Sequence, residues 1–410
     1  MPRLLLLLPT TTYRTKAFID AALKLGVEIV AASEQPSTMA ATNPAGLLAL
    51  DFFEPENAAR EAARFARQFP IDAVIPVDED TAVVAAYVAR ALDLDHNSVE
   101  STRAAKNKYL MREALGLAGC RVPRYRQFSL DDDLRETGKQ ISYPSVVKPV
   151  FLSTSRGVMR VDNESEFVSA VERLERIVEK KEVARRGGAA ARLALAEEFI
   201  PGQEVAVEGL VSDGRLRVLA IFDKPDPLDG PFFEETIYVT PSRLDESAQL
   251  EIEEAAAAAV RAMGLTRGPV HAELRVNDRG AWVIEVAARA IGGLCSRALK
   301  FGEDVSLEEI ILRHALGQDT GTIEREPMAS GVMMIPVPRA GVLKEVTGLE
   351  DAKRVSNIDD VIITAHITQQ IAPPPEGASY LGFIFARTAS PDEVEDALRE
   401  AHSRLRFIIE

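Results

Sequence analysis

The 410-residue sequence has little cysteine, little histidine and no long hydrophobic run. Its two cysteines, Cys120 and Cys295, are too few for a disulfide framework or a thiolate metal site, and they fit a reducing compartment. The five histidines do not cluster as a zinc site. The N-terminal apolar run covers only Leu4–Leu8, too short for a signal-peptide core or a membrane span. We therefore expect a cytoplasmic protein without a membrane partner, in which this run is a buried strand.

Positive charge is also scarce. Acidic residues outnumber basic ones by 63 to 48, which gives a net charge of −15. Such a surface argues against a nucleic-acid partner and against docking on anionic lipid, although a local basic pocket could still bind a small polyanion. With 46% hydrophobic and 27% charged residues the composition is that of a globular protein. The length predicts roughly two to four domains.

The first hundred residues alternate short apolar runs with amphipathic segments. Strands are expected at Leu4–Leu8, Val27–Ala31 and Ile71–Pro76, with helices between and after them. This alternation is typical of an α/β fold with a doubly wound parallel sheet. Ligands bind beyond the carboxyl ends of the strands in such sheets. Two segments are therefore of interest, Thr10–Arg14 and Val77–Asp80.

Beyond residue 100 the pattern changes to paired strands beside helices, which indicates α+β subdomains. We expect an α/β and α+β multidomain protein with parts at residues 1–100, 101–317 and 318–410. A hinge is expected within the second part, near residues 195–204. The segment Lys180–Ala191 is expected to form a mobile basic loop.

The stretch around Asp278-Arg279-Gly280 predicts a β-hairpin. A two-residue loop would place Glu273 opposite Ile284, whereas a three-residue loop with a left-handed Gly280 would place it opposite Glu285. The second register gathers one wholly apolar face, so we predict that Glu273 faces Glu285. The apolar face would carry Ala272, Leu274, Val276, Trp282, Ile284 and Val286. The other face would carry His271, Glu273, Arg275, Val283, Glu285, Ala287 and Arg289.

Two carboxylates in such a pair would lie about 4.5–5.5 Å apart at Cβ and repel each other. A hard divalent cation such as magnesium, which takes oxygen ligands, would offset the repulsion at Glu273 and Glu285. Alternatively, Arg275 neutralises the pair as a surface cluster. His271 on the same face is either a structural histidine or a substrate contact. Spacing alone leaves these alternatives open.

The residues Glu273, Glu285, Ala287 and Arg289 resemble the metal-binding signature of ATP-grasp enzymes, which usually ends in Glu-x-Asn-x-Arg. Ala287 at the asparagine position resembles the variant found in the carboxylate–amine ligase branch, which includes carnosine synthase and bacterial L-amino acid ligases. The resemblance covers essentially the whole chain. It implies a Rossmann-like pre-ATP-grasp domain, a two-subdomain ATP-grasp domain and a C-terminal ligase domain. It also implies ATP and Mg2+, with Mn2+ as a substitute.

The same resemblance implies which residues hold the phosphates. Lys108 and Lys148 would contact them, and a hydroxyl-rich loop with Ser153, Ser155 and Gly157 would cover them. Lys148 stands at the end of an apolar strand, where a buried charge is costly without a partner. The other four residues are weak signals by themselves, because a helical lysine or a serine-rich turn is common.

Further along, Glu197 and the backbone through Ile200 would hold adenine, and Glu204 would hold the ribose hydroxyls. Lys224 resembles the lysine that meets the terminal phosphate, although it could simply open a loop. Arg289 would grip the carboxylate and then the acyl phosphate, since a planar guanidinium binds both in a bidentate manner. Lys224 and Arg289 are thus the catalytic candidates.

Candidate substrate residues follow from the same resemblance. Glu79, with Asp78 as a competitor, and Glu235 match positions that hold the amino group of the acyl substrate. Tyr238 stands where this branch has a histidine, so the choice of substrate is expected to differ. Gly293 belongs to a run of small residues that leaves room for a bulky group.

The reaction implied is the formation of an amide or peptide bond through an acyl phosphate, with an amino acid or a related small acid as acyl substrate. The expected partners are small-molecule acids and amines, and a homodimer is common among similar enzymes. A purine-pathway ligase of the glycinamide ribonucleotide synthetase type is an alternative, but no extra basic cluster is visible for a ribose phosphate. A catalytically silent ATP-binding protein is a third reading. Arg14 would either meet a second carboxylate or remain exposed.

Overall fold

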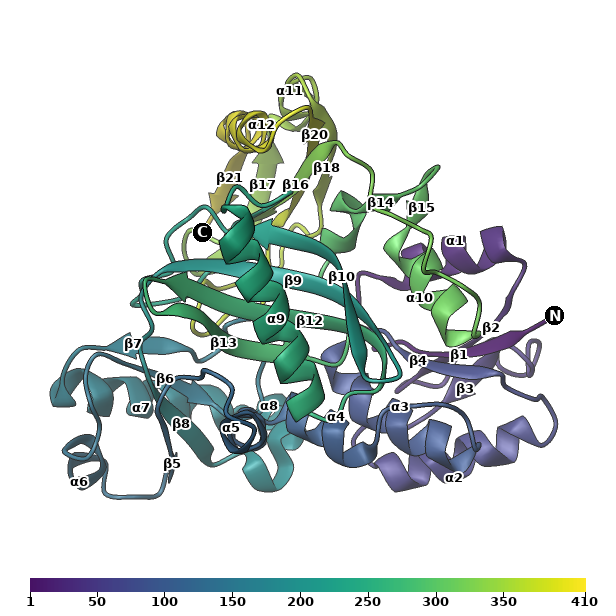
Figure 1. Cartoon of the computed structure of the whole chain (residues 1–410), viewed down its shortest axis with the longest axis horizontal. Coiled ribbons are helices and arrows are strands. Elements are labelled where there is room, and N and C mark those ends of the chain that lie inside the picture. The colour runs from purple at the N-terminus through teal and green to yellow at the C-terminus, as the bar shows by residue number, and fades with distance from the viewer.

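The computed structural model describes residues 1–410, and its N-terminal part is a four-stranded parallel sheet with helices on both faces (Figure 1). The strands lie in the order β3-β2-β1-β4. The elements are β1 (Arg3–Leu7), β2 (Glu28–Ser33), β3 (Leu47–Ala49), β4 (Ala73–Pro76), α1 (Thr15–Leu25), α2 (Pro55–Ala66) and α3 (Glu79–Ala91). The predicted doubly wound sheet is confirmed, and the short strand β3 is an addition to it.

The leucine run forms β1 because a central parallel strand is buried on both faces. Leu4 and Leu6 pack in one hydrophobic cluster with α1 and with α10 (Leu307–Ala315). Leu5 and Leu7 pack in a second cluster with α2 and α3. Because both faces are covered, the strand shows no polar alternation. The carboxyl end of β1 is thereby directed toward the centre of the molecule.

Residues 125–198 form a small lobe, an antiparallel sheet in the order β5-β8-β6-β7. Two helices lead into it, α4 (Val99–Lys106) and α5 (Lys108–Leu117). The lobe contains β5 (Tyr125–Ser129), β6 (Ser145–Pro149), β7 (Met159–Val161), β8 (Leu193–Glu198), α6 (Leu134–Gly138), α7 (Glu164–Val178) and α8 (Lys181–Gly187). The expected basic loop at 180–191 is wrong, since most of it is α8 followed by the 3-10 helix η1 (Gly188–Ala190). Val183 of α8 is fully buried, which anchors the helix on the lobe.

The remainder is organised by one eight-stranded sheet in the order β13-β12-β9-β10-β11-β16-β20-β18. Its strands are β9 (Gln203–Ser212), β10 (Arg215–Asp223), β11 (Ile237–Thr240), β12 (Arg267–Asn277), β13 (Gly280–Ala287), β16 (Ala329–Ile335), β18 (Ile358–Ile363) and β20 (Gly382–Thr388). Helix α9 (Glu246–Ala262) crosses the face of β10, β12 and β13 (Figure 1). The sheet runs without a break across residue 317, because β11 pairs with β16.

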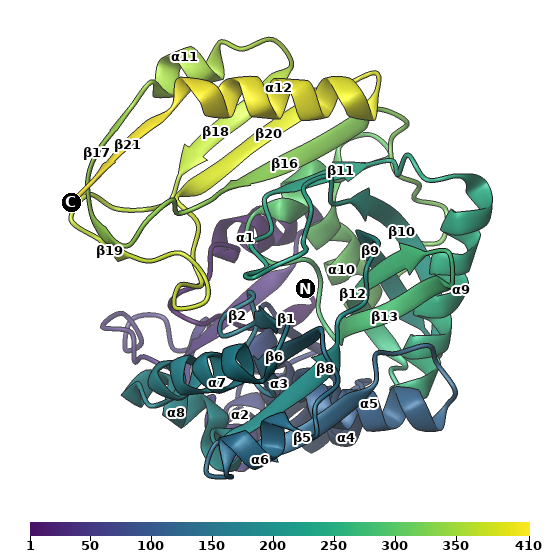
Figure 2. The same cartoon turned by 90° about the vertical axis from the view of Figure 1, so that its left-hand side faces the viewer.

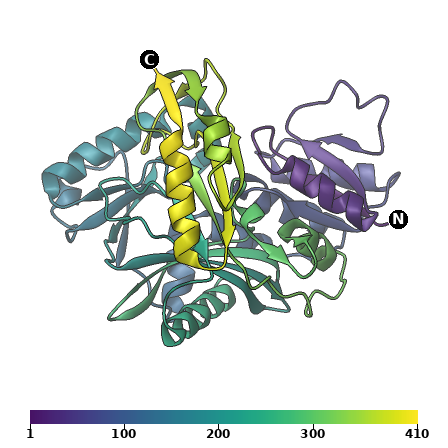
Figure 3. The same ribbon diagram turned by 90° about the horizontal axis from the view of Figure 1, so that it is seen from above.

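The C-terminal part, residues 329–410, covers the far end of this sheet. Helix α12 (Pro391–Arg404) lies along β16, β18 and β20 (Figure 2). Its other elements are β17 (Gly341–Thr347), β19 (Gln370–Ile371), β21 (Arg406–Ile409) and α11 (Leu349–Lys353). Short elements before it are η2 (Cys295–Ala298), β14 (Lys300–Phe301) and β15 (Val305–Ser306). Seen from above, the small lobe and the N-terminal sheet lie on opposite sides of α12 (Figure 3).

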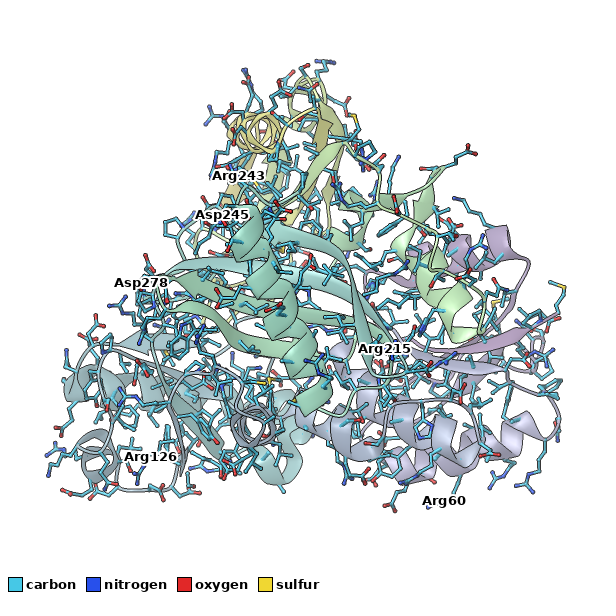
Figure 4. The ribbon with its side chains drawn as sticks, viewed as in Figure 1. Arg60, Arg126, Arg215, Arg243, Asp245 and Asp278 are labelled. Carbon is cyan, nitrogen blue, oxygen red and sulfur yellow. The ribbon has the colours of Figure 1, made fainter.

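The β12–β13 hairpin pairs Glu273 with Glu285, as predicted, but by a different route. Its turn is the two-residue loop Asp278-Arg279, labelled at Asp278 in Figure 4, because Asn277 pairs with Gly280. The register then shifts at Ile284, where two residues of β13 stand opposite one of β12. The predicted three-residue loop is therefore wrong, and a bulge inside the strand restores the pairing.

The two-residue turn and the bulge together exchange the faces of three residues. Val283, expected toward the site, is 1% exposed in the core beneath α9. Ile284, expected in the core, lines the cavity described below. Trp282, also expected in the core, has the guanidinium groups of Arg121 and Arg279 at 5.9 and 4.7 Å from its ring centroid. The bulge therefore brings an apolar side chain beside Glu285.

None of the helices has both the length and the apolarity that a bilayer span requires.

Candidate active site

A cavity lies between the small lobe and the eight-stranded sheet, with Met334 and Tyr380 of the C-terminal part on its wall. Many of the residues predicted from the sequence line it, namely Lys108, Lys148, Ser153, Ser155, Glu197, Ile200, Glu204, Glu235, Tyr238, His271, Glu273, Glu285, Arg289 and Gly293. Lys224 and Glu79 contact members of this set, and Gly157 precedes Val158, which also lines the cavity. The structure thus brings together positions that span more than half of the chain.

The two facing glutamates are neutralised by lysines. Lys108 Nζ lies 3.1 Å from Glu285 Oε2, and Lys224 Nζ lies 3.3 Å from Glu273 Oε1. Arg275 instead donates to Glu204 at 2.8 Å and to the Ile200 carbonyl at 2.8 Å. The alternative in which Arg275 neutralises the pair is therefore wrong. Two facing carboxylates with oxygen atoms directed into a cavity are suited to a divalent cation.

Lys224 follows β10 and lies among three carboxylates. Its Nζ is 2.8 Å from Glu204 Oε1, and it also donates to Glu235 and approaches Glu273. Oxygen atoms of these three carboxylates all lie within 4.8 Å of one another. Burial lowers the pKa of Lys224, but the surrounding carboxylates outweigh it and raise that pKa well above its usual value. The ammonium group of Lys224 therefore stays protonated within a cluster of carboxylate oxygens.

The carboxylates in this cluster do not titrate alike. Burial raises the pKa of Glu235 to about 7, against the opposing effect of Lys224. Burial acts in the same direction on Glu273, but Lys224 and His271 outweigh it and lower its pKa well below the usual value. Glu273 thus stays ionised, as a metal ligand must. The facing carboxylates of Glu273 and Glu285 therefore offer oxygen donors of the kind that magnesium takes.

Lys148 is buried at the end of β6, as its apolar strand predicted. Its Nζ lies 2.5 Å from Glu197 Oε2, and Arg112 Nε lies 2.8 Å from Glu197 Oε1. Burial lowers the pKa of Lys148. Arg112 was not among the predicted residues, although it follows Lys108 by four positions and therefore shares its face of α5. One buried carboxylate thus holds two cations beside the cavity.

The loop that was predicted to cover phosphates has an unusual backbone. Thr154 and Ser155 have φ values of 57° and 54°, a left-handed region that costs such residues about 1–3 kcal/mol. Gly157 has φ of 75°, and a Cβ there would lie 2.8 Å from Leu174. Its N–H donates to the carbonyl of Pro375 at 2.9 Å. Strain of this kind is common at ligand-binding loops.

At the other end of the cavity Arg289 Nε donates to Glu79 Oε2 at 2.9 Å. Asp78 instead caps α3 through Thr81, so of the two acidic candidates Glu79 is the one that reaches the site. Burial lowers the pKa of Arg289, but Glu79 and other carboxylates outweigh it and raise the value. This wall thus carries one acidic and one basic group in contact.

Tyr238 and Gly293 shape the neighbouring wall. The Tyr238 ring is 2% exposed and lies 5.1 Å from Lys224 Nζ. Gly293 has φ of 59°, and a Cβ there would lie 3.0 Å from the ring of Phe383. Cys295, 2% exposed, lines the same region. The wall is therefore mainly apolar and aromatic.

His271 is held between two carboxylates. Nδ1 lies 2.5 Å from Glu208 Oε1, and Nε2 lies 3.4 Å from Glu273 Oε1. Burial lowers its pKa, but the two carboxylates outweigh it and raise the pKa to about 9. Glu208 was not predicted, although it shares the face of Glu204 at a spacing of four along β9. His271 thus orients Glu273.

Three family models match this chain. The ATP-grasp N-terminal domain matches residues 19–96, the ATP-grasp domain matches residues 141–298, and the L-amino acid ligase C-terminal domain 2 matches residues 333–410. Together with the fold, they show that the chain belongs to the ATP-grasp superfamily.

Within that superfamily the chain is similar to L-amino acid ligases. The crystal structure of an L-amino acid ligase from Bacillus licheniformis superposes with a TM-score of 0.85 at 28% identity, covering 100% of this chain and 99% of that one. Alanine–anticapsin ligase from Bacillus subtilis is 29% identical over 294 residues, which is 66% of this chain and 61% of the relative. An L-arginine-specific L-amino acid ligase from Bacillus subtilis is 22% identical over 71% of this chain and 69% of its own length.

Proposed function

We propose that this chain is an ATP- and magnesium-dependent carboxylate–amine ligase that forms an amide or peptide bond. The acyl substrate is an amino acid or a related small carboxylic acid. The observation that carries the proposal is the pairing of Glu273 with Glu285 inside a cavity that also holds Lys108 and Arg289. The match to the L-amino acid ligase C-terminal domain and the similarity to the L-amino acid ligase structure support it.

In this proposal Glu273 and Glu285 hold Mg2+, which Mn2+ can replace. The bound ion would neutralise charge on the phosphates during transfer to the carboxylate. Lys108 and Lys148 bind phosphates, and the loop with Ser153, Ser155 and Gly157 covers them. The backbone near Ile200, anchored by Glu197, holds adenine, and Glu204 holds the ribose.

Two further cations act on the reacting groups. Lys224 supplies positive charge to the terminal phosphate, since its raised pKa keeps it protonated. Arg289 holds the carboxylate and then the acyl phosphate with two hydrogen bonds. Attack of the amine on the acyl carbon expels phosphate and forms the C–N bond. The amine loses one proton to solvent as this bond forms.

The substrate class follows from the charges and shape of the wall. Glu79 and Glu235 are carboxylates that can hold an α-amino group, and Arg289 can hold the α-carboxylate. The apolar lining by Tyr238, Cys295 and other residues suits a bulky, uncharged side chain. An amino acid meets all three requirements.

A purine-pathway ligase is disfavoured by the end of β1. The N–H of Thr10 donates to the carboxylate of Glu34 at 3.1 and 3.2 Å, and Arg14 is paired with Glu308. Donors that could bind a ribose phosphate there are already satisfied by acidic residues. Phosphoribosylglycinamide synthetase from Anaerococcus prevotii has a TM-score of 0.69 at 16% identity, which shows a shared fold alone. A silent ATP-binding protein is disfavoured because the candidate metal, phosphate and substrate residues all occur.

The test is a screen with ATP, MgCl2 and mixtures of the twenty protein amino acids. Phosphate release is measured together with product masses. We expect release that depends on amino acids and a product lighter than its two substrates by one water. Release that never depends on an added acid and amine would overturn the proposal. The parts at 1–100, 101–317 and 318–410, the cytoplasmic location and the homodimer stay predictions, which limited proteolysis, fractionation and sedimentation would test.

A further inference from the structure

We infer that Arg14 is a positioning residue for the substrate wall, which it builds by tying the turn that carries Glu79 to the segment that carries Cys295 and Ser296. The inference rests on the proposed function, because it concerns the same site. Arg14 is neither a substrate contact nor an exposed arginine, the two alternatives that the sequence left open. Its side chain is 2% exposed and lies outside the lining of the cavity.

Arg14 bonds to two separate parts of the chain. Its Nη1 donates to the carbonyl of Val77 at 3.1 Å, and its Nη2 donates to Glu308 Oε1 at 3.2 Å. Its guanidinium lies 5.1 Å from the ring of Phe18. Its Nε is buried and has no partner. Burying a charged guanidinium with an unpaired donor costs folding free energy, so we expect Arg14 to have a role other than stabilising the fold.

The first hydrogen bond, from Nη1 of Arg14, leads to the turn that carries Glu79. Val77 is the last residue before Asp78, the N-cap of α3, and Glu79 is the first residue of that helix. Holding the Val77 carbonyl therefore fixes where α3 begins. Because Glu79 accepts from Arg289 at 2.9 Å, a shift of this turn would change the spacing of the two groups that are proposed to grip the amino acid.

The second hydrogen bond, from Nη2 of Arg14, leads to the part of the wall that carries Cys295. Glu308 is 3% exposed at the start of α10, and its Oε1 also accepts from Ser296 Oγ at 2.7 Å. Ser296 follows Cys295, which lines the cavity. The hydrogen bonds from Ser296 through Glu308 and Arg14 to Val77 thus join the segment after β13 to the N-terminal sheet. Glu79 and Cys295 are thereby set at a fixed distance.

The requirement for arginine follows from this geometry. A planar guanidinium can donate in two directions at once, whereas a lysine ammonium at the same place reaches one acceptor well. Arg14→Lys should keep the ion pair with Glu308 and weaken the bond to Val77. Arg14→Met should lose both and leave Glu308 buried without a cation.

The experiment compares Arg14→Met with the wild-type full-length protein in two measurements. The first is hydrogen–deuterium exchange of the amides of residues 79–82, without ligands. The second is the apparent KM for an equimolar mixture of the twenty protein amino acids and, separately, for ATP. We expect faster exchange at residues 79–82 and an amino-acid KM raised about tenfold, with the KM for ATP changed by less than about twofold. Arg14→Lys should recover part of the loss.

Two controls separate positioning from stability. Arg3→Met removes an arginine at the opposite end of β1, which bonds to Glu28 and to the carbonyl of Pro70, and should leave both KM values unchanged. Arg14→Met/Glu308→Leu removes the unpaired buried carboxylate as well. It should regain thermal stability and still show the raised amino-acid KM.

The outcomes distinguish this inference from the proposed function. Exchange at residues 79–82 that matches wild type overturns the inference, whatever the protein catalyses. Faster exchange with an unchanged amino-acid KM also overturns it, as does an amino-acid KM that recovers with stability in the double variant. If wild type shows no amino-acid-dependent turnover but the exchange rises as expected, the ligase proposal fails and the placement of Glu79 by Arg14 stands.

Discussion

Arg173 of α7 and Glu376 of the loop between β19 and β20 form a two-bond ion pair, with Nε–Oε1 at 2.5 Å and Nη2–Oε2 at 2.8 Å. The pair joins the small lobe to the C-terminal part. The adjacent Pro375 carbonyl accepts from Gly157 N–H at 2.9 Å. The C-terminal part therefore contacts the loop that is proposed to cover the phosphates. We expect this loop and the C-terminal part to move together.

Breaking this pair should weaken ATP binding. In Glu376→Gln one charge is lost from a bidentate pair whose side chains are about one-third exposed, so we expect a modest effect. The KM for ATP should rise roughly two- to fivefold, since the covering loop loses part of its support. Asp131→Asn, which breaks an exposed pair with Arg192 inside the small lobe, is the matched control. Equal KM values in both variants would contradict the coupling.

Replacing one of the facing glutamates should stop turnover without unfolding the protein. Glu285→Gln keeps the shape of the side chain but removes the charge proposed to hold magnesium. We expect amino-acid-dependent phosphate release to fall by at least about a hundredfold. Circular dichroism should be unchanged, because the side chain is 22% exposed and not part of the core. Undiminished release would sink the metal assignment, and Glu253→Gln on the exposed face of α9 is the control.

Glu197 should matter for stability as well as for binding. It is 3% exposed and is the shared partner of Arg112 and Lys148, so Glu197→Gln leaves two buried cations facing each other. Removing one member of such a group typically costs about 3–5 kcal/mol. Urea unfolding should show a lowered midpoint. Glu198→Gln alters a carboxylate paired with the exposed Arg124 and should cost much less. A cost for Glu197→Gln near that of the control would contradict the shared-partner role.

Local patterns were sufficient for most of the strands, whereas most residues of the candidate site were implied by the resemblance to ATP-grasp enzymes. The apolar run at Leu4–Leu8 specifies a strand that is buried on both faces, and the alternation around residues 270–289 specifies strands that are buried on one face. The pairing of Glu273 with Glu285 was predicted for the wrong reason. The hydrophobic pattern of the hairpin does not distinguish a three-residue loop from a two-residue loop followed by a bulge, because both pair Glu273 with Glu285.

Contacts between distant segments were not accessible from sequence patterns. Arg14 and Glu308 are 294 residues apart, Arg173 and Glu376 are 203 apart, and Arg112 and Glu197 are 85 apart. Each pair joins different parts of the molecule, so no local periodicity marks it. Single charged residues of this kind look like solvated ones until the fold brings their partners together.

His314 provides a test of the structure away from the site. It is 7% exposed on α10, and one ring nitrogen lies 2.9 Å from Ser212 Oγ. Burial, together with the positive charges of Arg267 and Arg217, lowers its pKa from 6.5 to about 4. Between these two values the unfolded chain binds a proton that the folded chain does not. Stability must therefore fall as the pH drops from about 6.5 to about 4.

The measurement is the thermal midpoint between pH 7.5 and pH 4 for wild type and His314→Gln. Glutamine can keep the bond to Ser212 but does not titrate, so the variant should lose less stability over this window. Carboxylates that titrate in the same range act equally on both proteins and cancel in the difference. His366→Gln, at an exposed position, is the control. Parallel curves for wild type and His314→Gln would show that His314 is not held in its neutral form by burial beside the two arginines.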